Sequence, residues 1–269
     1  MTTKKTLAQI LNDMWKDYCN LNPAALKIYE LLTQQGEIIL NDHVAYRTFN
    51  HPRLGIKSLA QHFESWGYKE SNDYTFVEKK LYAKHYQHPD SQLPKIFISE
   101  LQLEKVSSLI QSEAEKLVSQ VPDSLIQSED FVIGGRPWAV AHSTYEKLAA
   151  ESEYASWVAA FGFRPNHFTV NINALKNFSQ VAEINTFLKS KGIVLNSSGG
   201  EVKGTAADFL EQSSTMAEEV PVKFTDGTFL VPACYYEFAK RHLLPNGQLY
   251  QGFVTKSADK IFESTDRIK

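Results

Sequence analysis

Hydrophobic residues recur at helical spacing through the first part of the chain. Leu7, Ile10 and Met14 share one helical face, and the same period resumes after a short break. Asn22 followed by Pro23 is a helix-start signal, because the asparagine side chain accepts from a free N–H group and proline fits the first helical position. We therefore predict two consecutive helices at the start of the chain.

The pattern then changes to the period of two that is typical of strands with one buried face. Residues 42–49, 73–86 and 94–101 alternate in this way, and residues 56–66 between the first two show a helical period. A strand, a helix and further strands together form a βαβββ unit. We assign this first module to residues 36–101.

Residues 102–158 have a different character. The segment LEKVSSLIQSEAEKLVSQV is amphipathic at helical spacing, and the rest is mostly helical in pattern, with a break at Gly134 and Gly135. We interpret this stretch as a helical insertion between two α+β halves.

A second module is expected over residues 160–255. The segment NHFTVNI alternates like a strand, and the helix that follows it ends at Gly192, a residue suited to a helix C-terminus. Asp226 and Gly227 stand between two alternating runs, which is a strong hairpin signal. CYYEFAK is expected as the last strand.

The two halves repeat the same order of elements. Each has a strand with an early histidine, His43 or His167, then a helix, a glycine, and a final strand that carries a glutamate, Glu100 or Glu237. The alternative is chance, since the chain has eight histidines. The repeat predicts an α+β fold in which two βαβββ modules form one cupped mixed sheet, and residues 1–269 form a single domain.

Equivalent strands in such a sheet bring their concave-face side chains together. His43, His167 and Glu237 would then meet as two imidazoles and one carboxylate, a set that leaves positions open and suits Fe(II) and oxygen chemistry. A structural zinc site would use thiolates, and Cys19 and Cys234 are poorly placed for that. The alternatives are structural histidines and a glutamate that is paired with a nearby cation.

Arg47 strengthens this hypothesis because it shares a strand face with His43, with the small Ala45 between them. A buried arginine is costly unless it meets an anion, and its planar fork fits a carboxylate. We therefore expect Arg47 to bind the substrate, a small dicarboxylate or oxo acid. Gln212 and Ser214 would also reach the substrate if their segment is a strand, although a turn is an equal alternative.

Glu100 has two interpretations. It is either a fourth metal ligand or a carboxylate at the start of the helix that follows it, and we prefer the second. His85 and His88 also have a spacing that suggests metal, but histidines in loops are usually solvated.

Composition excludes several classes of function. The chain has 269 residues, 43% of them hydrophobic, and a net charge of −3, with no basic block. Binding to nucleic acid or to an anionic membrane is therefore not expected. Two isolated cysteines, no signal peptide and no long apolar run fit a reducing compartment, and we expect a cytoplasmic protein.

Three segments resemble one known family. HVAYRTF with His43 and Arg47, NHFTVNI with His167, and YYEFAKR with Glu237 occur in this order in the DUF1338 family, whose characterised members are 2-oxoadipate dioxygenase/decarboxylases of the vicinal-oxygen-chelate superfamily. The resemblance implies Fe(II) and O2 acting on 2-oxoadipate to give 2-hydroxyglutarate and CO2. By residue match the two histidines and Glu237 would be the iron ligands, and Arg47 would bind a substrate carboxylate.

Two other functions stay open on the same scaffold. One is a metal-dependent lyase, isomerase or hydrolase, which a four-ligand site including Glu100 would favour. The other is a module that binds a small molecule without catalysis. Neither the oligomeric state nor a contribution of residues 102–158 to the site follows from the sequence.

Overall fold

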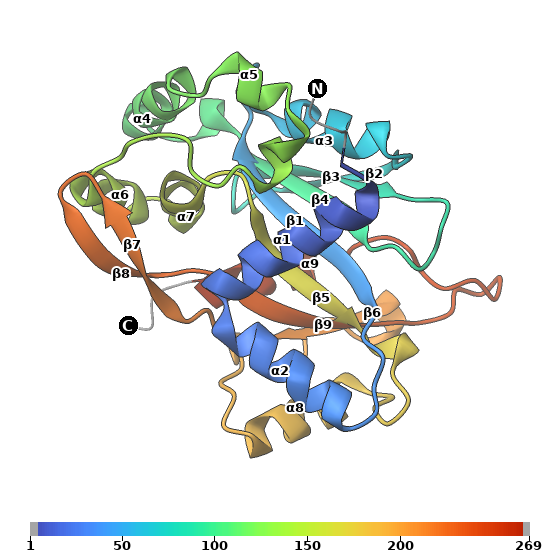
Figure 1. Cartoon of the computed structure of the whole chain (residues 1–269). Coiled ribbons are helices and arrows are strands. Elements are labelled where there is room, and N and C mark those ends of the chain that lie inside the picture. Colours follow the sequence, from blue (N-terminus) through green and yellow to red (C-terminus); the bar gives the residue numbers. More distant parts are fainter. Residues whose placement is uncertain (1–4, 266–269) are drawn as a thin grey trace.

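The computed structural model describes residues 5–265, apart from the side chains of residues 257–259. It begins with the two predicted helices, α1 (Leu7–Leu21) and α2 (Pro23–Gln34). Asn22 caps α2 by accepting from the Ala25 N–H, as the sequence signal indicates. Both helices lie across one face of the central sheet (Figure 1).

The core of the molecule is a seven-stranded mixed sheet with the strand order β2-β3-β4-β1-β5-β9-β6. The first-half strands are β1 (Asn41–Phe49), β2 (Lys69–Phe76), β3 (Leu81–Gln87) and β4 (Lys95–Leu101). The second-half strands are β5 (Pro165–Asn171), β6 (Leu210–Ser214) and β9 (Tyr235–Arg241). This curled sheet confirms the predicted α+β fold class.

The strand pairing reproduces the internal repeat. In the first half β1 runs parallel to β4, and in the second half β5 runs parallel to β9. The halves join where β1 and β5 pair antiparallel at the centre of the sheet. The crossover helices are α3 (Ile56–Ser65) and α8 (Val181–Ser190), each followed by a left-handed glycine, Gly67 or Gly192.

The second module contributes three strands to the main sheet, whereas the first module contributes four. Its predicted hairpin exists as β7 (Glu219–Phe224) and β8 (Gly227–Pro232), but the pair forms a separate two-stranded sheet. The hairpin leaves the sheet because its turn binds the insertion: Asp226 accepts from the His142 N–H, and the His142 ring stacks on Phe229. Figure 1 shows it beside α6.

The insertion is helical, as expected. Its helices are α4 (Ser108–Ser119), α5 (Asp123–Ile126), α6 (His142–Ala149) and α7 (Glu153–Phe161), with 3-10 turns at Leu103–Lys105 and Glu129–Ile133. Helix α4 is shorter than the segment with the amphipathic pattern, because the Ser107 side chain caps its N-terminus by accepting from the Ile110 N–H. Every residue of α7 after Glu153 is buried.

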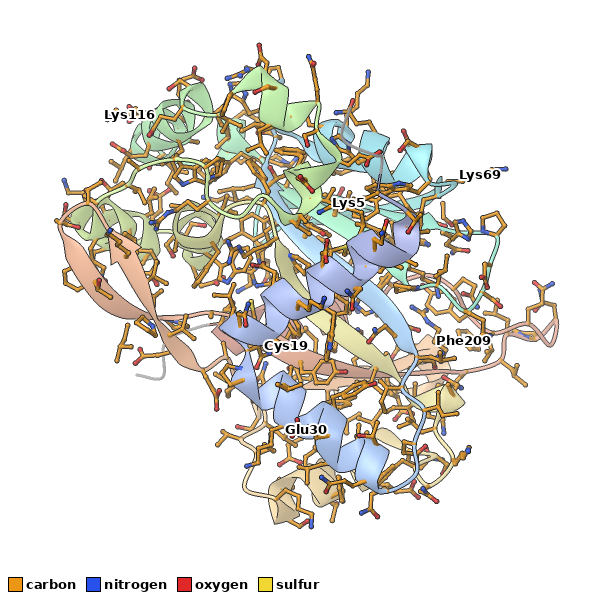
Figure 2. All side chains as sticks on the ribbon, viewed as in Figure 1. Lys5, Cys19, Glu30, Lys69, Lys116 and Phe209 are labelled. Atoms are coloured by element: carbon orange, nitrogen blue, oxygen red, sulfur yellow. The ribbon has the colours of Figure 1, made fainter. Side chains whose placement is uncertain are left out.

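Short 3-10 turns complete the second half. They lie at Ile172–Ala174, Ala206–Asp208 and Glu263–Thr265. Lysines such as Lys69 and Lys116 project outward (Figure 2). Within residues 5–265, no helix combines the length and apolar character that a membrane span requires.

A C-terminal segment that the sequence patterns did not predict packs against the concave face of the sheet. Helix α9 (Thr255–Phe262) contacts β2 and β6, strands at opposite edges of the sheet. The Phe262 ring meets Phe76 of β2, and Phe253 packs on Phe97 of β4. This segment therefore closes the half-barrel that the sheet forms.

Glu100 caps a helix, but a different one from the helix expected. Its carboxylate accepts from the Ile56 N–H at 2.9 Å, at the start of α3, where Gly55 has no side chain to serve as a cap. The reason is spatial, since β4 runs parallel to β1 and α3 follows β1 directly.

We expect Glu100→Ala to lower the free energy of unfolding by about 1 kcal/mol, because an N–H at the start of α3 loses its acceptor. Denaturant unfolding measures this change, with Glu78→Ala in the exposed β2–β3 turn as the control. The amount of bound metal should not change. Loss of metal from Glu100→Ala would restore the four-ligand interpretation.

Candidate metal centre

Three adjacent central strands supply the candidate metal ligands. In register, His43 of β1 lies opposite Thr169 of β5, and Thr169 lies opposite Glu237 of β9. His167 is two residues from Thr169 on β5 and therefore shares its face. The pairing of the two halves thus places all three predicted ligands on the concave face.

The ligand atoms are spaced as a metal requires. His43 Nε2 lies 3.6 Å from Glu237 Oε1, and His167 Nε2 lies 3.4 Å from Glu237 Oε2. All three candidate ligand atoms lie within 4.8 Å of one another. Ligands at about 2.0–2.2 Å from one ion stand roughly 3–3.5 Å apart, so the set fits a divalent metal with small adjustments.

The residue before each histidine orients its ring. His43 Nδ1 lies 2.8 Å from Asp42 Oδ1, and His167 Nδ1 lies 3.1 Å from Asn166 Oδ1. A register shift between Asn41 and His43 lets the Asp42 side chain point to the same side of the sheet as the His43 side chain. Because these oxygens accept from Nδ1, each Nε2 presents its lone pair toward the site, the arrangement found around metal-bound histidines. Thr169 Oγ1 lies 3.1 Å from His43 Nε2, so a metal would take the place of that hydrogen bond.

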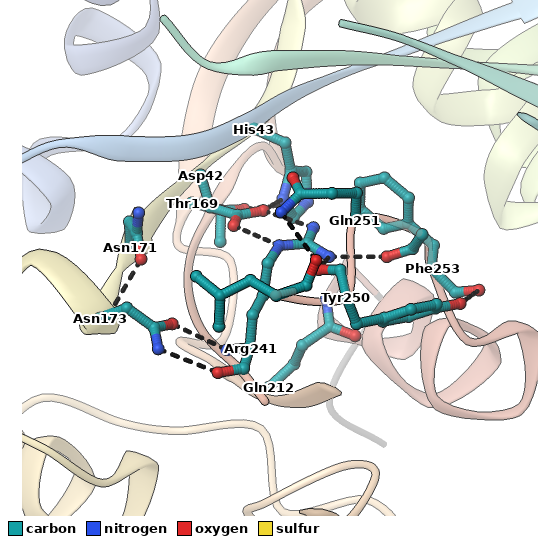
Figure 3. Close-up of polar contacts among 12 residues, drawn as sticks. Asp42, His43, Thr169, Asn171, Asn173, Gln212, Arg241, Tyr250, Gln251 and Phe253 are labelled. Carbon is teal, nitrogen blue, oxygen red and sulfur yellow. Dashed lines mark hydrogen bonds and ion pairs between the residues drawn. The ribbon is translucent and has the colours of Figure 1, made fainter. Parts of the chain in front are cut away.

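Asp42 is itself held by a buried cation. Arg241 donates from Nε at 2.6 Å and from Nη2 at 2.8 Å to the two oxygens of Asp42, and its Nη1 donates to the carbonyls of Tyr250 and Gly252 (Figure 3). This bidentate pair holds the pKa of Asp42 well below its ordinary value, although burial alone would raise it. Asp42 is therefore a charged acceptor for His43.

Glu237 has no arginine or lysine as an ion-pair partner within the described part of the chain. Arg241 pairs with Asp42, and Lys240 donates to Gln180, so neither of these nearby cations is the partner of Glu237. Gln212 donates to Glu237 Oε1. Burial nevertheless raises the pKa of Glu237 to about 8. A carboxylate in this setting either keeps a proton or binds a cation.

Both histidines are neutral, as metal ligands must be. Burial lowers the pKa of His43, and burial followed by the neighbouring His43 lowers that of His167 well below its ordinary value. The three side chains are 1–5% exposed. Two neutral imidazoles cannot compensate the charge of the carboxylate. A divalent metal bound by all three side chains would compensate it.

Arg47 lies on the same face but already has an anion. Glu153, at the start of α7, accepts from its Nη1 at 2.8 Å, and Thr265 Oγ1 accepts from Nη2 at 3.1 Å. The Trp157 and Phe262 rings flank the guanidinium at 5.3 and 5.6 Å. The buried Arg47 therefore does not require an external anion, because Glu153 of the insertion provides one.

Gln212 and Ser214 do lie on a strand, β6, and both are buried. Gln212 contacts Glu237, while the Ser214 hydroxyl lies 2.8 Å from that of Ser264 in the C-terminal segment. His85 is also on a strand rather than in a loop. It hydrogen-bonds Tyr74 at 2.9 Å and lies outside the candidate ligand set.

Sequence reasoning missed Asp42, Asn166 and Phe253. The first two had a signal, because the repeated histidines are preceded by an acidic residue and its amide analogue. Phe253 had none: its ring meets His43 edge-on at 4.8 Å and covers the site from a segment with no clear period.

The sequence matches the family model described as 2-oxoadipate dioxygenase/decarboxylase over residues 2–130 and 135–249. The chain belongs to this family. A chloroplastic 2-oxoadipate dioxygenase/decarboxylase of Arabidopsis thaliana is 35% identical over 283 residues, covering 95% of this chain and 76% of the relative. The family match confirms the resemblance found in the sequence.

Solved structures agree with this 2-oxoadipate dioxygenase/decarboxylase family. The rice hydroxyglutarate synthase in complex with 2-oxoadipate has a TM-score of 0.91 and 33% identity, covering 96% of this chain and 91% of that one. A presumed hydrolase from Shewanella frigidimarina has a TM-score of 0.90 and 50% identity, covering 94% and 99%. A presumed glyoxalase-superfamily protein from Ralstonia eutropha shares the fold, with a TM-score of 0.76, 18% identity, and coverage of 89% and 83%.

The raised pKa of Glu237 gives the metal-free protein a defined pH dependence. The folded chain keeps this proton up to about pH 8, whereas the unfolded chain releases it near 4.5, so stability from this group falls as pH rises. The lowered histidine pKa values act in the opposite sense, but only below 6.5. Between pH 6.5 and pH 8 only Glu237 of these three groups contributes, and we expect the free energy of unfolding to fall by at most about 2 kcal/mol over this interval.

The control for this pH dependence is Glu237→Gln, which cannot ionise. Its unfolding free energy should lack the decline, and so should that of metal-loaded wild-type protein, in which the metal holds the carboxylate ionised. A decline of equal size in Glu237→Gln would contradict the assignment.

Asn166 tests histidine orientation more cleanly than Asp42, which also compensates Arg241. We expect Asn166→Ala to weaken metal binding by about 10- to 100-fold, because the His167 ring loses its acceptor. Competition with a chromophoric chelator measures the affinity. Asn171→Ala, at the end of the same strand, is the matched control, and unchanged affinity in Asn166→Ala would refute the role.

Proposed function

We propose that the protein is an Fe(II)-dependent dioxygenase/decarboxylase that converts 2-oxoadipate and O2 to 2-hydroxyglutarate and CO2. The observation that carries this proposal is the set of two neutral imidazoles and one uncompensated carboxylate on the concave face. Such a set leaves open positions on iron for a chelating substrate and oxygen. Relatives that bear the name of this activity support the choice of substrate.

Each side chain has a separate role in this proposal. His43, His167 and Glu237 hold the metal, and Gln212 orients Glu237 by donating to Oε1. The bound metal would supply a Lewis acid and an electron source for the reaction with O2. Arg47 binds the carboxylate at the far end of the substrate, and Gln212 and Ser214 remain proposed substrate contacts, Ser214 after Ser264 moves away.

The reaction is balanced without a further co-substrate. Cleavage of the bond between C1 and C2 of 2-oxoadipate releases C1 as CO2, and both oxygen atoms of O2 enter the products. The two electrons lost in the decarboxylation and the two from hydroxylation of the shortened chain together reduce one O2. The chain therefore needs to bind only the 2-oxo acid, O2 and the metal.

The C-terminal segment excludes water from this chemistry. Phe253 covers His43, and Thr265 and Phe262 cover Arg47. Since the candidate ligands are at most 5% exposed, substrate enters only when part of this segment moves. Closure afterwards leaves the reacting groups in a dry site.

A hydrolase is the second candidate, because the presumed hydrolase from Shewanella frigidimarina is 50% identical to this chain. A metal-activated water would then replace O2.

We also propose that the chain forms a single domain. From the two unpaired cysteines we propose a reducing compartment such as the cytoplasm, although the Arabidopsis thaliana relative is described as chloroplastic.

Oxygen uptake separates these functions. With Fe(II) added anaerobically, we expect wild-type protein to consume O2 only when 2-oxoadipate is present, with CO2 released in equal amount. His43→Ala should reduce the rate by at least about 10³-fold, because the metal loses a ligand, and Arg47→Lys should raise KM by roughly 10-fold or more, because the planar fork is lost.

His51→Ala, a change near the surface outside the site, is the control and should retain full activity. Metal binding without oxygen uptake would reject the dioxygenase and favour the hydrolase. Absence of metal binding would reject both.

A further inference from the structure

Tyr235 is a buried residue of the concave face to which the roles above assign nothing. It precedes Glu237 by two residues on β9, so the two side chains share a face. Its backbone pairs with His167, and its ring stacks on that imidazole at 4.6 Å with an interplanar angle of 24°. The phenol is therefore held rigidly beside a candidate metal ligand.

The strand directions place Tyr235 between the metal centre and Arg47. Moving along β1 from His43 to Arg47 corresponds to moving backwards along β5 and β9, because β5 is antiparallel to β1 and parallel to β9. Tyr235 is thus displaced from Glu237 in the direction in which Arg47 is displaced from His43. A substrate that extends from the metal centre to Arg47 passes this side chain.

Two buried donors on this route have no partner. Neither the Tyr235 hydroxyl nor Arg47 Nε has a hydrogen-bond partner among the described residues, although both side chains are at most 1% exposed. Burial raises the pKa of Tyr235 well above its ordinary value, and the nearby Arg47 lowers it by its charge and by its capacity to donate a hydrogen bond to the phenol oxygen. Buried polar groups are nearly always paired, so two neighbouring unpaired donors indicate a missing acceptor.

Arg47 alone is a weak carboxylate site in this chain. Glu153 takes Nη1 and offsets the positive charge, and Thr265 takes Nη2. A second donor from a neutral side chain would restore the ability to bind an anion without adding charge. Tyr235 is placed to provide that donor.

We propose that the Tyr235 hydroxyl and Arg47 Nε–H together bind the carboxylate at the far end of the substrate, and that Tyr235 thereby selects 2-oxo dicarboxylic acids over 2-oxo monocarboxylic acids. This inference rests on the proposed function, whose substrate it narrows. A site built to hydrogen-bond a polar group rejects an analogue that lacks it, because its donors then stay buried and unpaired.

The test compares 2-oxoadipate with 2-oxohexanoate, which has the same chain length but ends in a methyl group. Tyr235→Phe removes only the hydroxyl and keeps the stacking on His167. We expect kcat/KM for 2-oxoadipate to fall by about tenfold or more, mainly through KM, while 2-oxohexanoate is unaffected and bound metal is unchanged.

The chain offers a matched control in Tyr236. It is also fully buried, and its hydroxyl also lacks a partner among the described residues, but it lies on the opposite face beside Trp15 of α1. Tyr236→Phe should leave the ratio between the two substrates as in wild type. If Tyr235→Phe affects both substrates equally, or neither, Tyr235 does not select the far carboxylate.

Binding measurements separate this inference from the proposed function. Anaerobic calorimetry of the metal-loaded protein gives the affinity for each 2-oxo acid without turnover. If wild type binds 2-oxoadipate but does not consume O2, and Tyr235→Phe still weakens only that ligand, the activity is wrong and the selection stands. If wild type does not bind 2-oxoadipate, or the variant binds both acids as wild type does, the selection is refuted.

Discussion

The Glu237 carboxylate, buried against two neutral imidazoles, is the constraint around which the site is built. Its charge has no arginine or lysine in an ion pair within the described residues, and burial raises its pKa to about 8. A group in this state contributes to stability only as a proton carrier or as a metal ligand. Folding and metal binding are therefore linked through one side chain, and the neighbouring hydrogen bonds keep it in place.

The same network connects the metal centre to its cover. Asp42 accepts from His43 and pairs with Arg241, which in turn donates to the carbonyls of Tyr250 and Gly252. The segment that carries Phe253 over the site is thus fixed by the cation that sets the charge of Asp42. A displacement that admits substrate and keeps this pair intact would therefore involve residues after Gly252.

The internal repeat made the candidate ligands predictable, because pairing of equivalent strands dictates where His43, His167 and Glu237 meet. The register shift at Asp42 involves only neighbouring residues, but the alternation of hydrophobic and polar residues in the sequence does not show it. Glu153 was not predictable as the partner of Arg47, since 106 residues separate them and only the packing of α7 brings them together. The C-terminal cover is a short helix whose contacts with two distant strands leave no pattern in the sequence.

The charges around the site explain why an anionic substrate suits it. The Asp42–Arg241 pair is neutral, and so is the Arg47–Glu153 pair. With neutral histidines, Glu237 would contribute one negative charge to a divalent ion, which leaves one positive charge at the buried centre, and the charges of Lys95 and Lys203 nearby add to the positive field. The carboxylate beside the 2-oxo group would cancel that charge on binding. The far carboxylate then meets a neutral pair, so its recognition depends on hydrogen-bond donors rather than on net charge, and the unpaired donors lie where that need arises.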